Sequence, residues 1–569
     1  SSVVNSIIQI RNLEYSYRRQ KDWPALRGIN LEIEAGEFVA IAGRAGSGKS
    51  TLCYALNGLI PHSFGGDFKG EIIVCGLNTR IASVPQLARQ VGFVMQNAES
   101  QLVGLTVEDD AAFGPENLGL PTADVALRVK QALRAVRLDA NLQRSPWSLS
   151  GGQKQRLSIA AALAIQPRVL VLDNPTAELD PVGKEEVMAI LGQLNSELGI
   201  TVVIVNQELE EILPYATRLV LMNEGQIQCT GRPAEVIDHA SDVHGAGVRL
   251  PEIAQMADAL REHGRWPARL PVTVAEAVKR LQDMPSAAMS RSSSGPRVPT
   301  DETMIDMKDV SFAYPDSTPV LRNITLTVHR GEFVTLMGPN AAGKTTLAKL
   351  MNGLLSPTTG RVLVRGTDAG AIRLAELAKT VGYVFQNPDH QLFARTIKEE
   401  LAFGPRNLGW TKAEVENAVA RGLKHVGGPN RGEEDPFFLG LAERKLVSIA
   451  SVLAMGPEIL VLDEPATGAD HEAALRIMNY LAGLHLQGLT IVIVTHDVSL
   501  AATYADRIIV MRSGSIVLDG TPNQVFRNRD LLRTCAINPP QAADLAEKLR
   551  LPDFTCRVDE IVERFAGGS

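Results

Sequence analysis

The chain has 569 residues, and because a single hydrophobic core stops growing at roughly 250 to 300 residues, we expect two or more domains. Its net charge of −7 provides no general attraction for polyanions, which disfavours nucleic acid as a partner. The five cysteines show none of the paired spacings of metal or redox sites, a usage typical of reduced thiols in a cytosolic protein.

The first half of the chain alternates short apolar runs with helical patterns. The runs FVAIAG at 38–43, VLVLD at 169–173 and TVVIV at 201–205 are almost wholly apolar, as strands buried on both faces are. A helical pattern begins at Lys49. This order predicts an α/β fold with a mostly parallel sheet flanked by helices.

The segment GRAGSGKST at 43–51 follows the first of these strands and opens the helix, which is the context of a phosphate-binding loop. Glycines let backbone amides turn toward phosphate oxygens, and the helix N-terminus favours negative charge. Lys49 would contact the β- and γ-phosphates, and the Ser50 hydroxyl would ligate Mg²⁺. The nucleotide-binding candidates in this loop are Gly43, Gly46, Gly48, Lys49, Ser50 and Thr51.

An aspartate, Asp173, ends the VLVLD strand at the edge of the sheet where phosphate loops bind nucleotide, so it is a candidate ligand for Mg²⁺. A lone carboxylate after an apolar strand is also common as a helix cap. The magnesium interpretation therefore depends on the phosphate loop that precedes it.

The second half of the chain repeats the first. VGFVMQNAESQL from Val91 returns as VGYVFQNPDHQL from Val381, 290 residues later. A second phosphate loop, GPNAAGKTT, occupies 338–346, and the strand ILVLD ends in a second metal candidate, Asp463. The nucleotide-binding candidates here are Gly338, Asn340, Gly343, Lys344, Thr345 and Thr346, of which Thr345 is also a metal candidate.

A stretch rich in Ser, Pro and Gly separates the two copies and is typical of a flexible linker. Each copy ends in helical patterns, LPEIAQMADALREH with VAEAVKRL and PPQAADLAEKLR with VDEIVERF, which predict a small packing or dimerisation appendix. The predicted boundaries are 1–235 for the first nucleotide domain, 236–284 for its appendix, 285–302 for the linker, 303–527 for the second nucleotide domain and 528–569 for its appendix.

LSGGQKQRLSIAAAL from Leu149 resembles the signature of ATP-binding-cassette (ABC) ATPases, and with both phosphate loops the resemblance covers nearly the whole chain. In that family two nucleotide domains pair head to tail, and each ATP lies between the phosphate loop of one domain and the signature of the other. The resemblance implies that hydroxyl and backbone donors of the signature reach a γ-phosphate across this interface. The corresponding residues are Ser150, Gly151, Gly152 and Gln153.

The same resemblance assigns further roles around the nucleotide. Tyr17 and Tyr314 would stack on adenine, with ordinary packing as the alternative. Gln96 and Gln386 would sense the γ-phosphate and contribute to the Mg²⁺ site. ATP and Mg²⁺ are the implied cofactors, and closure and opening of the paired domains is the implied mechanical output.

The two copies differ at the residues that would hydrolyse ATP. In the second copy Glu464 can orient or deprotonate the attacking water, and His496 would hold the γ-phosphate by resemblance. The first copy has Asn174 and Gln207 instead, and an amide cannot accept the proton. An engineered trap substitution is the alternative explanation for Asn174, but Gln207 and an altered signature favour natural asymmetry. The predicted catalytic set is Glu464, His496, Gln386 and Lys344.

The signature is damaged in the opposite copy. LSGGQ at 149–153 becomes LGLAE at 439–443, which removes the serine hydroxyl, puts a leucine where glycine allows close approach and adds a carboxylate near the phosphates. Under head-to-tail pairing all the losses fall in one site, so the sequence predicts one hydrolytic site and one degenerate site with slow or no turnover. The degenerate-site residues are Asn174, Gln207, Gly440, Leu441, Ala442 and Glu443.

The segments after Gln96 and Gln386 resemble a segment peculiar to ATPases of energy-coupling-factor (ECF) transporters, which import cobalt and vitamins. NAESQL and NPDHQL are followed by VEDDAAFGPENLGL and IKEELAFGPRNLGW. In that family the segment forms a groove for coupling helices of a transmembrane scaffold, and its acid pairs with an arginine. The corresponding groove residues are Glu99, Gln101, Asp389 and Gln391, with a solvated acidic helix face as the alternative.

The longest apolar runs, such as Val169–Leu172, fall far short of the ~20 residues of a membrane helix. We therefore expect the motor subunit of an ECF-type importer for a vitamin or metal-type micronutrient, peripheral on the cytoplasmic face and docked on a scaffold and a substrate-binding membrane component. The rival is a soluble tandem ABC factor acting on ribosomes or nucleic acid, which the acidic chain and the short, nearly neutral linker disfavour. A purely structural nucleotide-binding dimer conflicts with the intact Glu464 site.

Overall fold

The computed structural model describes residues 6–18, 23–177, 179–206, 208–285, 300–315 and 318–567. The chain divides into two compact units, Ser1–Leu281 and Gln282–Ser569, which we call the first and second cassette. Gln207 and most of the predicted linker, 286–299, lie outside the described residues.

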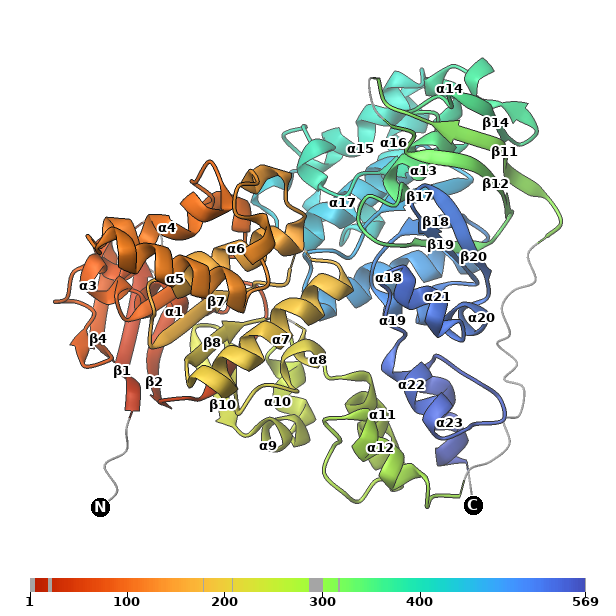
Figure 1. Ribbon diagram of the computed structural model, residues 1–569. Helices are drawn as coiled ribbons and strands as arrows, with labels where there is room; N and C mark the ends of the chain where they lie inside the picture. The colour runs from red at the N-terminus through yellow and green to blue at the C-terminus, as the bar shows by residue number, and fades with distance from the viewer. Residues whose placement is uncertain are drawn as a thin grey trace. The chain divides into compact units, whose positions relative to one another are not determined.

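Each cassette contains two sheets (Figure 1). In the described part of the first cassette, an antiparallel sheet has the order β2-β1-β4-β5, and a six-stranded sheet has the order β10-β9-β3-β8-β7-β6 with only β10 antiparallel to its neighbour. The strands are β1 Ser6–Tyr17, β2 Leu26–Glu34, β3 Phe38–Ala42, β4 Gly66–Val74, β5 Leu77–Asn78, β6 Val91–Val94, β7 Val169–Asp173, β8 Thr201–Val205, β9 Arg218–Asn223 and β10 Gln226–Gly231.

The second cassette repeats this topology with the orders β12-β11-β14-β15 and β16-β17-β18-β13-β19-β20 among its described residues. Its strands are β11 Thr303–Phe312, β12 Leu321–His329, β13 Phe333–Met337, β14 Thr359–Val364, β15 Thr367–Asp368, β16 Val381–Val384, β17 Ile459–Asp463, β18 Thr490–Val494, β19 Arg507–Arg512 and β20 Ser515–Gly520. The predicted mostly parallel sheet is confirmed, and the antiparallel sheet is an addition that the apolar runs did not indicate, because its strands alternate buried and exposed residues.

Each cassette also contains helices, some of which flank the sheets (Figure 1). In the first cassette they are α1 Lys49–Leu56, α2 Leu59–His62, α3 Val84–Ala88, α4 Val107–Asn117, α5 Thr122–Ala135, α6 Gly151–Ala164, α7 Pro181–Leu198, α8 Leu209–Ile212, α9 Pro233–Asp238, α10 Ala240–Gly245, α11 Glu252–Glu262 and α12 Val274–Leu281. In the second they are α13 Lys344–Met351, α14 Leu374–Leu377, α15 Ile397–Asn407, α16 Lys412–His425, α17 Leu441–Leu453, α18 His471–Leu486, α19 Val498–Tyr504, α20 Pro522–Phe526, α21 Arg529–Thr534, α22 Gln541–Lys548 and α23 Val558–Ala566.

The core of each cassette lies between its two sheets, around the helix that follows the phosphate loop. The helices α4, α5 and α6 pack on one another as a separate layer, and α15, α16 and α17 do the same in the second cassette. Helices α6 and α17 begin at the two signature segments. Within the described ranges, no helix has both the length and the apolar composition needed to cross a bilayer.

Candidate functional site

The second phosphate loop joins β13 to α13 and is closely held by its neighbours. A Cβ on Gly338 would lie 2.3 Å from the Met511 carbonyl oxygen, so this position accepts only glycine. Gly343 has a left-handed φ of 99°, and a Cβ there would lie 2.6 Å from Leu321 Cδ2. Lys344 Nζ donates to the Gly338 and Pro339 carbonyl oxygens, each at 2.8 Å. The loop thus brings the Lys344 side chain and the N-terminus of α13 to the same backbone turn.

The first phosphate loop, between β3 and α1, repeats this geometry. A Cβ on Gly43 would lie 2.2 Å from the Met222 carbonyl oxygen, and one on Gly48 would lie 2.4 Å from the Ala25 carbonyl oxygen. Lys49 Nζ donates to the Gly43 carbonyl oxygen at 2.7 Å. Both loops therefore have the same backbone arrangement, and it is compatible with the phosphate binding that the glycine spacing predicts.

One residue of the first loop makes a contact that sequence reasoning missed. Arg44 stands where the second loop has Pro339, and its backbone N–H donates to the Ala246 carbonyl oxygen at 2.7 Å. Its guanidinium also donates to the Gly245 carbonyl oxygen at 3.1 Å. These bonds tie the first phosphate loop to the end of α10, a link that the proline cannot form through its own nitrogen.

The aspartates that end β7 and β17 lie beside the phosphate loops. Thr345 Oγ1 donates to Asp463 Oδ1 at 3.2 Å, and burial raises the pKa of Asp463 although this bond opposes the shift. Burial also raises the pKa of Asp173, which a hydrogen bond from Ser50 lowers in part. A hydroxyl and a carboxylate oxygen in contact are suitable donors for Mg²⁺, so the residues fit the metal.

Tyr383 is a neighbour of this pair that sequence reasoning missed. It lies on β16, is buried, and its hydroxyl donates to Asp463 Oδ2 at 3.4 Å. The first copy has Phe93 at this position, so Asp173 receives no such bond from it. The sequence signal for this residue was the difference between the two strands, VGFV and VGYV, at Phe93 and Tyr383.

The two candidate adenine tyrosines lie next to the helices that follow the phosphate loops. The Tyr17 hydroxyl is 3.1 Å from Thr51 Oγ1, and the Tyr314 hydroxyl is 3.4 Å from Thr346 Oγ1. Each ring also makes an edge contact with the aromatic residue two positions earlier, with centroids 4.9 Å apart. The position is compatible with both the stacking prediction and the packing alternative.

Glu464 follows β17 and is the centre of a connected polar group in the second cassette. His496 Nδ1 lies 3.1 Å from Glu464 Oε1, and Thr467 Oγ1 donates to Glu464 Oε2 at 2.8 Å. Burial raises the pKa of Glu464, but the contacts with His496 and Thr467 and the charge of Lys344 outweigh it, and the pKa lies below its usual value. The carboxylate is therefore ionised near neutral pH and able to accept a proton.

The backbone of Glu464 is in the left-handed region, with φ 49°, and its counterpart Asn174 has φ 52°. Asparagine tolerates this conformation better than glutamate. Lys445 Nζ donates to the Glu464 carbonyl oxygen at 2.9 Å. The bond from Lys445 to the carbonyl oxygen of Glu464 thus stabilises the strained backbone of this residue.

The first cassette has a different polar group beside Asn174. Thr176 Oγ1 donates to Glu211 Oε2 at 2.8 Å, and Asn206 Nδ2 donates to the same oxygen at 3.0 Å. Lys184 Nζ lies 2.6 Å from Glu211 Oε1, and the pKa of Glu211 is raised to about 7, chiefly by burial. The second copy has alanine in place of Thr176 and leucine in place of Glu211, so this group belongs to the first cassette alone.

The two signature segments differ at the start of their helices. Ser150 caps α6: its hydroxyl accepts from the Gln153 backbone N–H at 3.3 Å, and Gln153 Oε1 accepts from the Ser150 N–H at 3.1 Å. Gly440 begins α17 with no side-chain cap. Glu443 Oε1 instead lies 2.9 Å from Arg431 in its own cassette, so its charge is paired there. Glycine in place of serine at an N-cap costs only roughly a few tenths of a kcal/mol of helix stabilisation.

The candidate glutamines and partner-groove residues lie on the loops after β6 and β16. Gln96 and Gln386 are exposed. Gln101 Oε1 accepts from the Met95 N–H at 2.8 Å, and Gln391 Nε2 donates to the Ser448 carbonyl oxygen at 2.8 Å. Both loops are therefore attached to their own cassettes through a glutamine at the same position.

The groove acids have basic partners within the chain. Glu99 forms a salt bridge with Lys154 of α6, and Asp389 forms one with Arg444 of α17. Lys154 and Arg444 occupy the same position in the two copies. Large apolar side chains on the loop and helix that follow each acid in the sequence are exposed: Val103, Leu105 and Phe113 in the first cassette and Phe393 and Phe403 in the second. An acid with a basic neighbour beside exposed apolar groups is a surface on which an amphipathic segment can dock.

Two stretches of the chain, 26–177 and 321–467, match the protein-family model described as "ABC transporter". The chain belongs to this family. The two matches show that it is a tandem ABC ATPase, and the enzyme hydrolyses ATP and uses Mg²⁺.

Relatives of this tandem ABC ATPase match along almost their whole length. A protein of Caldanaerobacter subterraneus subsp. tengcongensis, provisionally named an ABC transporter ATP-binding protein, is 39% identical over 95% of this chain and 96% of its own. One of Methanosarcina mazei with the same provisional name is 36% identical over 97% of this chain and 95% of its own. Among solved structures, cbiO1 of Clostridium perfringens, titled as part of the ABC transporter complex cbiONQ, is 32% identical over 43% of this chain and all of its own, with a TM-score of 0.39.

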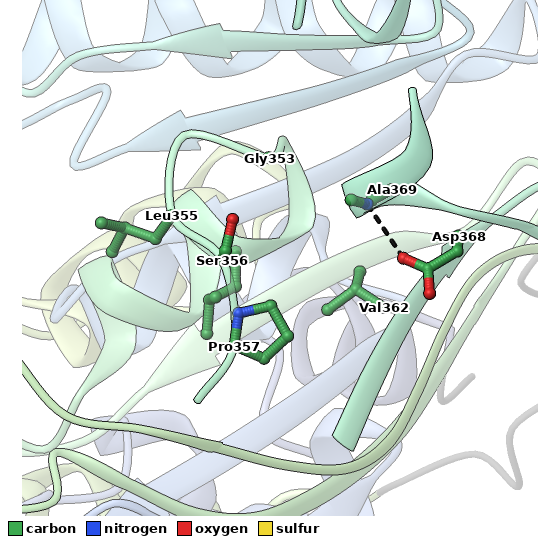
Figure 2. Close-up of a pocket in the computed structure, with 9 residues that line it drawn as sticks. Gly353, Leu355, Ser356, Pro357, Val362, Asp368 and Ala369 are labelled. Carbon is green, nitrogen blue, oxygen red and sulfur yellow. Dashed lines mark hydrogen bonds between the residues drawn. The ribbon is translucent and has the colours of Figure 1, made fainter. Parts of the chain in front are cut away.

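A small pocket of the second cassette lies apart from the residues discussed above. Figure 2 shows the side chains of Leu355, Pro357, Val362 and Asp368 around it. Asp368 Oδ1 accepts from the Gly370 backbone N–H at 2.9 Å, so the acid stabilises its own turn. Apart from Ser356, the remaining lining is apolar or glycine, and the pocket has no basic side chain that could bind a phosphate.

Proposed function

We propose that this ABC ATPase is the motor subunit of an importer of the ECF type that carries a vitamin or metal-type micronutrient. Its two cassettes would pair head to tail within one chain. One site, made of the second phosphate loop and the first signature, would hydrolyse ATP. The other site would bind nucleotide with little or no turnover. The subunit would be peripheral, on the cytoplasmic face of the membrane.

The observation that carries the proposal is the contrast between Glu464 and Asn174. Glu464 has an ionised carboxylate held by two side chains, next to a phosphate loop and a buried aspartate. Asn174 has the same backbone conformation but no carboxylate. The altered signature is in the cassette that contains Glu464, so head-to-tail pairing would keep the intact parts together.

In the proposed mechanism, Lys344 and the amides of α13 bind the β- and γ-phosphates, while Thr345 and Asp463 hold Mg²⁺, which neutralises phosphate charge when bound. Glu464 orients the attacking water and accepts its proton. His496 holds the carboxylate in place through Nδ1, and its other nitrogen would contact the γ-phosphate. Ser150 of the other cassette would donate to the γ-phosphate.

The transporter assignment is supported by the loops after β6 and β16 and by the names of the full-length relatives, which are ABC transporter proteins. The acid–base pairs beside exposed apolar side chains suit a coupling helix of a membrane scaffold. A substrate-binding membrane component would complete the complex. A factor that acts on ribosomes or nucleic acid would need cationic surfaces, whereas the net charge here is −7.

The test is purification of the tagged chain from detergent-solubilised membranes of its native host, followed by mass spectrometry. We expect stoichiometric integral membrane proteins, and loss of these partners when Asp389→Arg reverses a groove charge. Glu416→Arg, on the exposed face of α16 in the same layer, is the control and should keep them. Recovery of ribosomal proteins or DNA instead would refute the transporter assignment.

A further inference from the structure

Lys445 is a buried cation on α17, only 5% exposed, and none of the predicted roles includes it. Its Nζ donates to the Glu464 carbonyl oxygen at 2.9 Å and to the Thr467 carbonyl oxygen at 2.7 Å. Burial lowers its pKa to about 8, although the charges of Glu464 and Asp463 oppose this shift. A lysine in such a place needs a reason, because desolvation of an ammonium group is costly.

The two carbonyl oxygens that Lys445 binds belong to the first and last residues of the 464–467 turn, which begins with the catalytic candidate Glu464. The Thr467 N–H donates to the Glu464 carbonyl oxygen at 3.3 Å, and the Thr467 hydroxyl donates to the Glu464 carboxylate at 2.8 Å. Lys445 therefore fixes the backbone of Glu464. It also fixes the backbone of Thr467, whose hydroxyl holds one oxygen of the Glu464 carboxylate. It does so while Glu464 is in the left-handed region, where a residue other than glycine is strained by about 1 to 3 kcal/mol.

The first cassette lacks this arrangement at every corresponding position. Gln155 replaces Lys445, Asn174 replaces Glu464 and Ala177 replaces Thr467. The Gln155 amide nitrogen is buried and, among the described residues, has no hydrogen-bond partner. The amide nitrogen therefore forms no bond to the 174–177 turn, and the residues at the lysine and glutamate positions both differ between the copies.

We propose that Lys445 is a positioning residue for ATP hydrolysis, which holds the 464–467 turn so that the Glu464 carboxylate faces the attacking water. This inference rests on the proposed role of Glu464. In the part of the chain that the structure describes, Lys445 Nζ forms no hydrogen bond or ion pair with that carboxylate and is bonded to peptide carbonyls of the turn. Small displacements of a reacting group cost up to about 100-fold in rate, which sets the scale of the effect.

The first test is Lys445→Met, which keeps an unbranched side chain that is one atom shorter and removes the donors. We expect kcat for MgATP hydrolysis to fall between about 10- and 100-fold, with KM for MgATP within about twofold of wild type. Loss of the ammonium group leaves two carbonyl oxygens without one bond each, at a cost of about 1 to 3 kcal/mol, so the melting temperature checks that the variant folds. Lys445→Gln, which copies the first cassette, is the second variant and should lose as much.

The second test separates positioning from general structure. In a Glu464→Gln background Lys445→Met should cause no further loss of kcat, because the group it positions is gone. The matched control is Gln155→Met, which should leave kcat within about twofold of wild type. If Glu464→Gln keeps wild-type activity, the proposed function fails. If Glu464→Gln abolishes activity but Lys445→Met does not alter kcat, only the role of Lys445 is refuted. The same conclusion follows if Gln155→Met lowers kcat as much as Lys445→Met does.

Discussion

The two cassettes have the same strand order and the same phosphate-loop geometry, yet they differ in the polar groups at the ends of β7 and β17. In the second cassette, Glu464 is held by His496, Thr467 and Lys445. In the first, the corresponding space contains Asn174 and a separate group around Glu211. The comparison shows that the two copies share the backbone of the phosphate loop, while the side chains proposed for proton transfer are present in one copy.

The largest expected effect comes from Glu464→Gln. Because general-base catalysis contributes about 100- to 10,000-fold, we expect kcat to fall by at least about 100-fold, measured as phosphate release from MgATP. Asn174→Gln is the matched control, and its rate should stay within about twofold of wild type. Equal losses in the two variants would contradict the assignment of a single hydrolytic site.

The next effect tests the head-to-tail pairing. Ser150→Ala removes a hydroxyl that we expect to bind the γ-phosphate at the hydrolytic site, and a hydrogen bond to a charged group contributes about 1.5 to 3 kcal/mol. The rate of hydrolysis should therefore fall by about 10-fold or more. Gly440→Ala at the other signature should have little effect on it. The opposite pattern would mean that each cassette works with its own signature.

A smaller effect should follow from Tyr383→Phe, which gives the second cassette the residue found at Phe93. The loss of one bond to Asp463 should raise the Mg²⁺ concentration required for half-maximal activity about threefold, by the modest net value of such a bond. A magnesium titration of ATPase activity measures this. Phe93→Tyr should not shift the titration, and a shift there would place the working metal site in the first cassette.

The smallest effect is expected from Asn174→Glu. A carboxylate at this position would face Ala177, which has no hydroxyl to hold it, and Gln155 in place of a lysine. We expect steady-state hydrolysis to rise by less than about twofold. A larger gain would show that the carboxylate is all that the first cassette lacks, and would remove the basis for a role of Thr467 and Lys445.

The sequence was sufficient for the features that depend on local pattern. The apolar runs predicted β3, β7 and β8 because a parallel strand covered on both faces has few polar residues. The phosphate loops followed from glycine spacing. The roles of Lys445 and Tyr383 could not be predicted in this way, because their partners are distant in sequence and meet them only through the packing of α17 and β16. Their differences between the copies were visible in the repeat, but no local rule attached a function to them.

The bond between Arg44 and Ala246 has a consequence for the phosphate cradle itself. Pro339 has no amide hydrogen, and the amide hydrogen of Arg44 is already donated to a carbonyl. At the second position of either loop, therefore, no backbone donor is left over for a phosphate oxygen. Arg44 and Pro339 are unlike residues, yet neither offers a backbone amide hydrogen to a phosphate. Only Arg44 also attaches its loop to the end of α10.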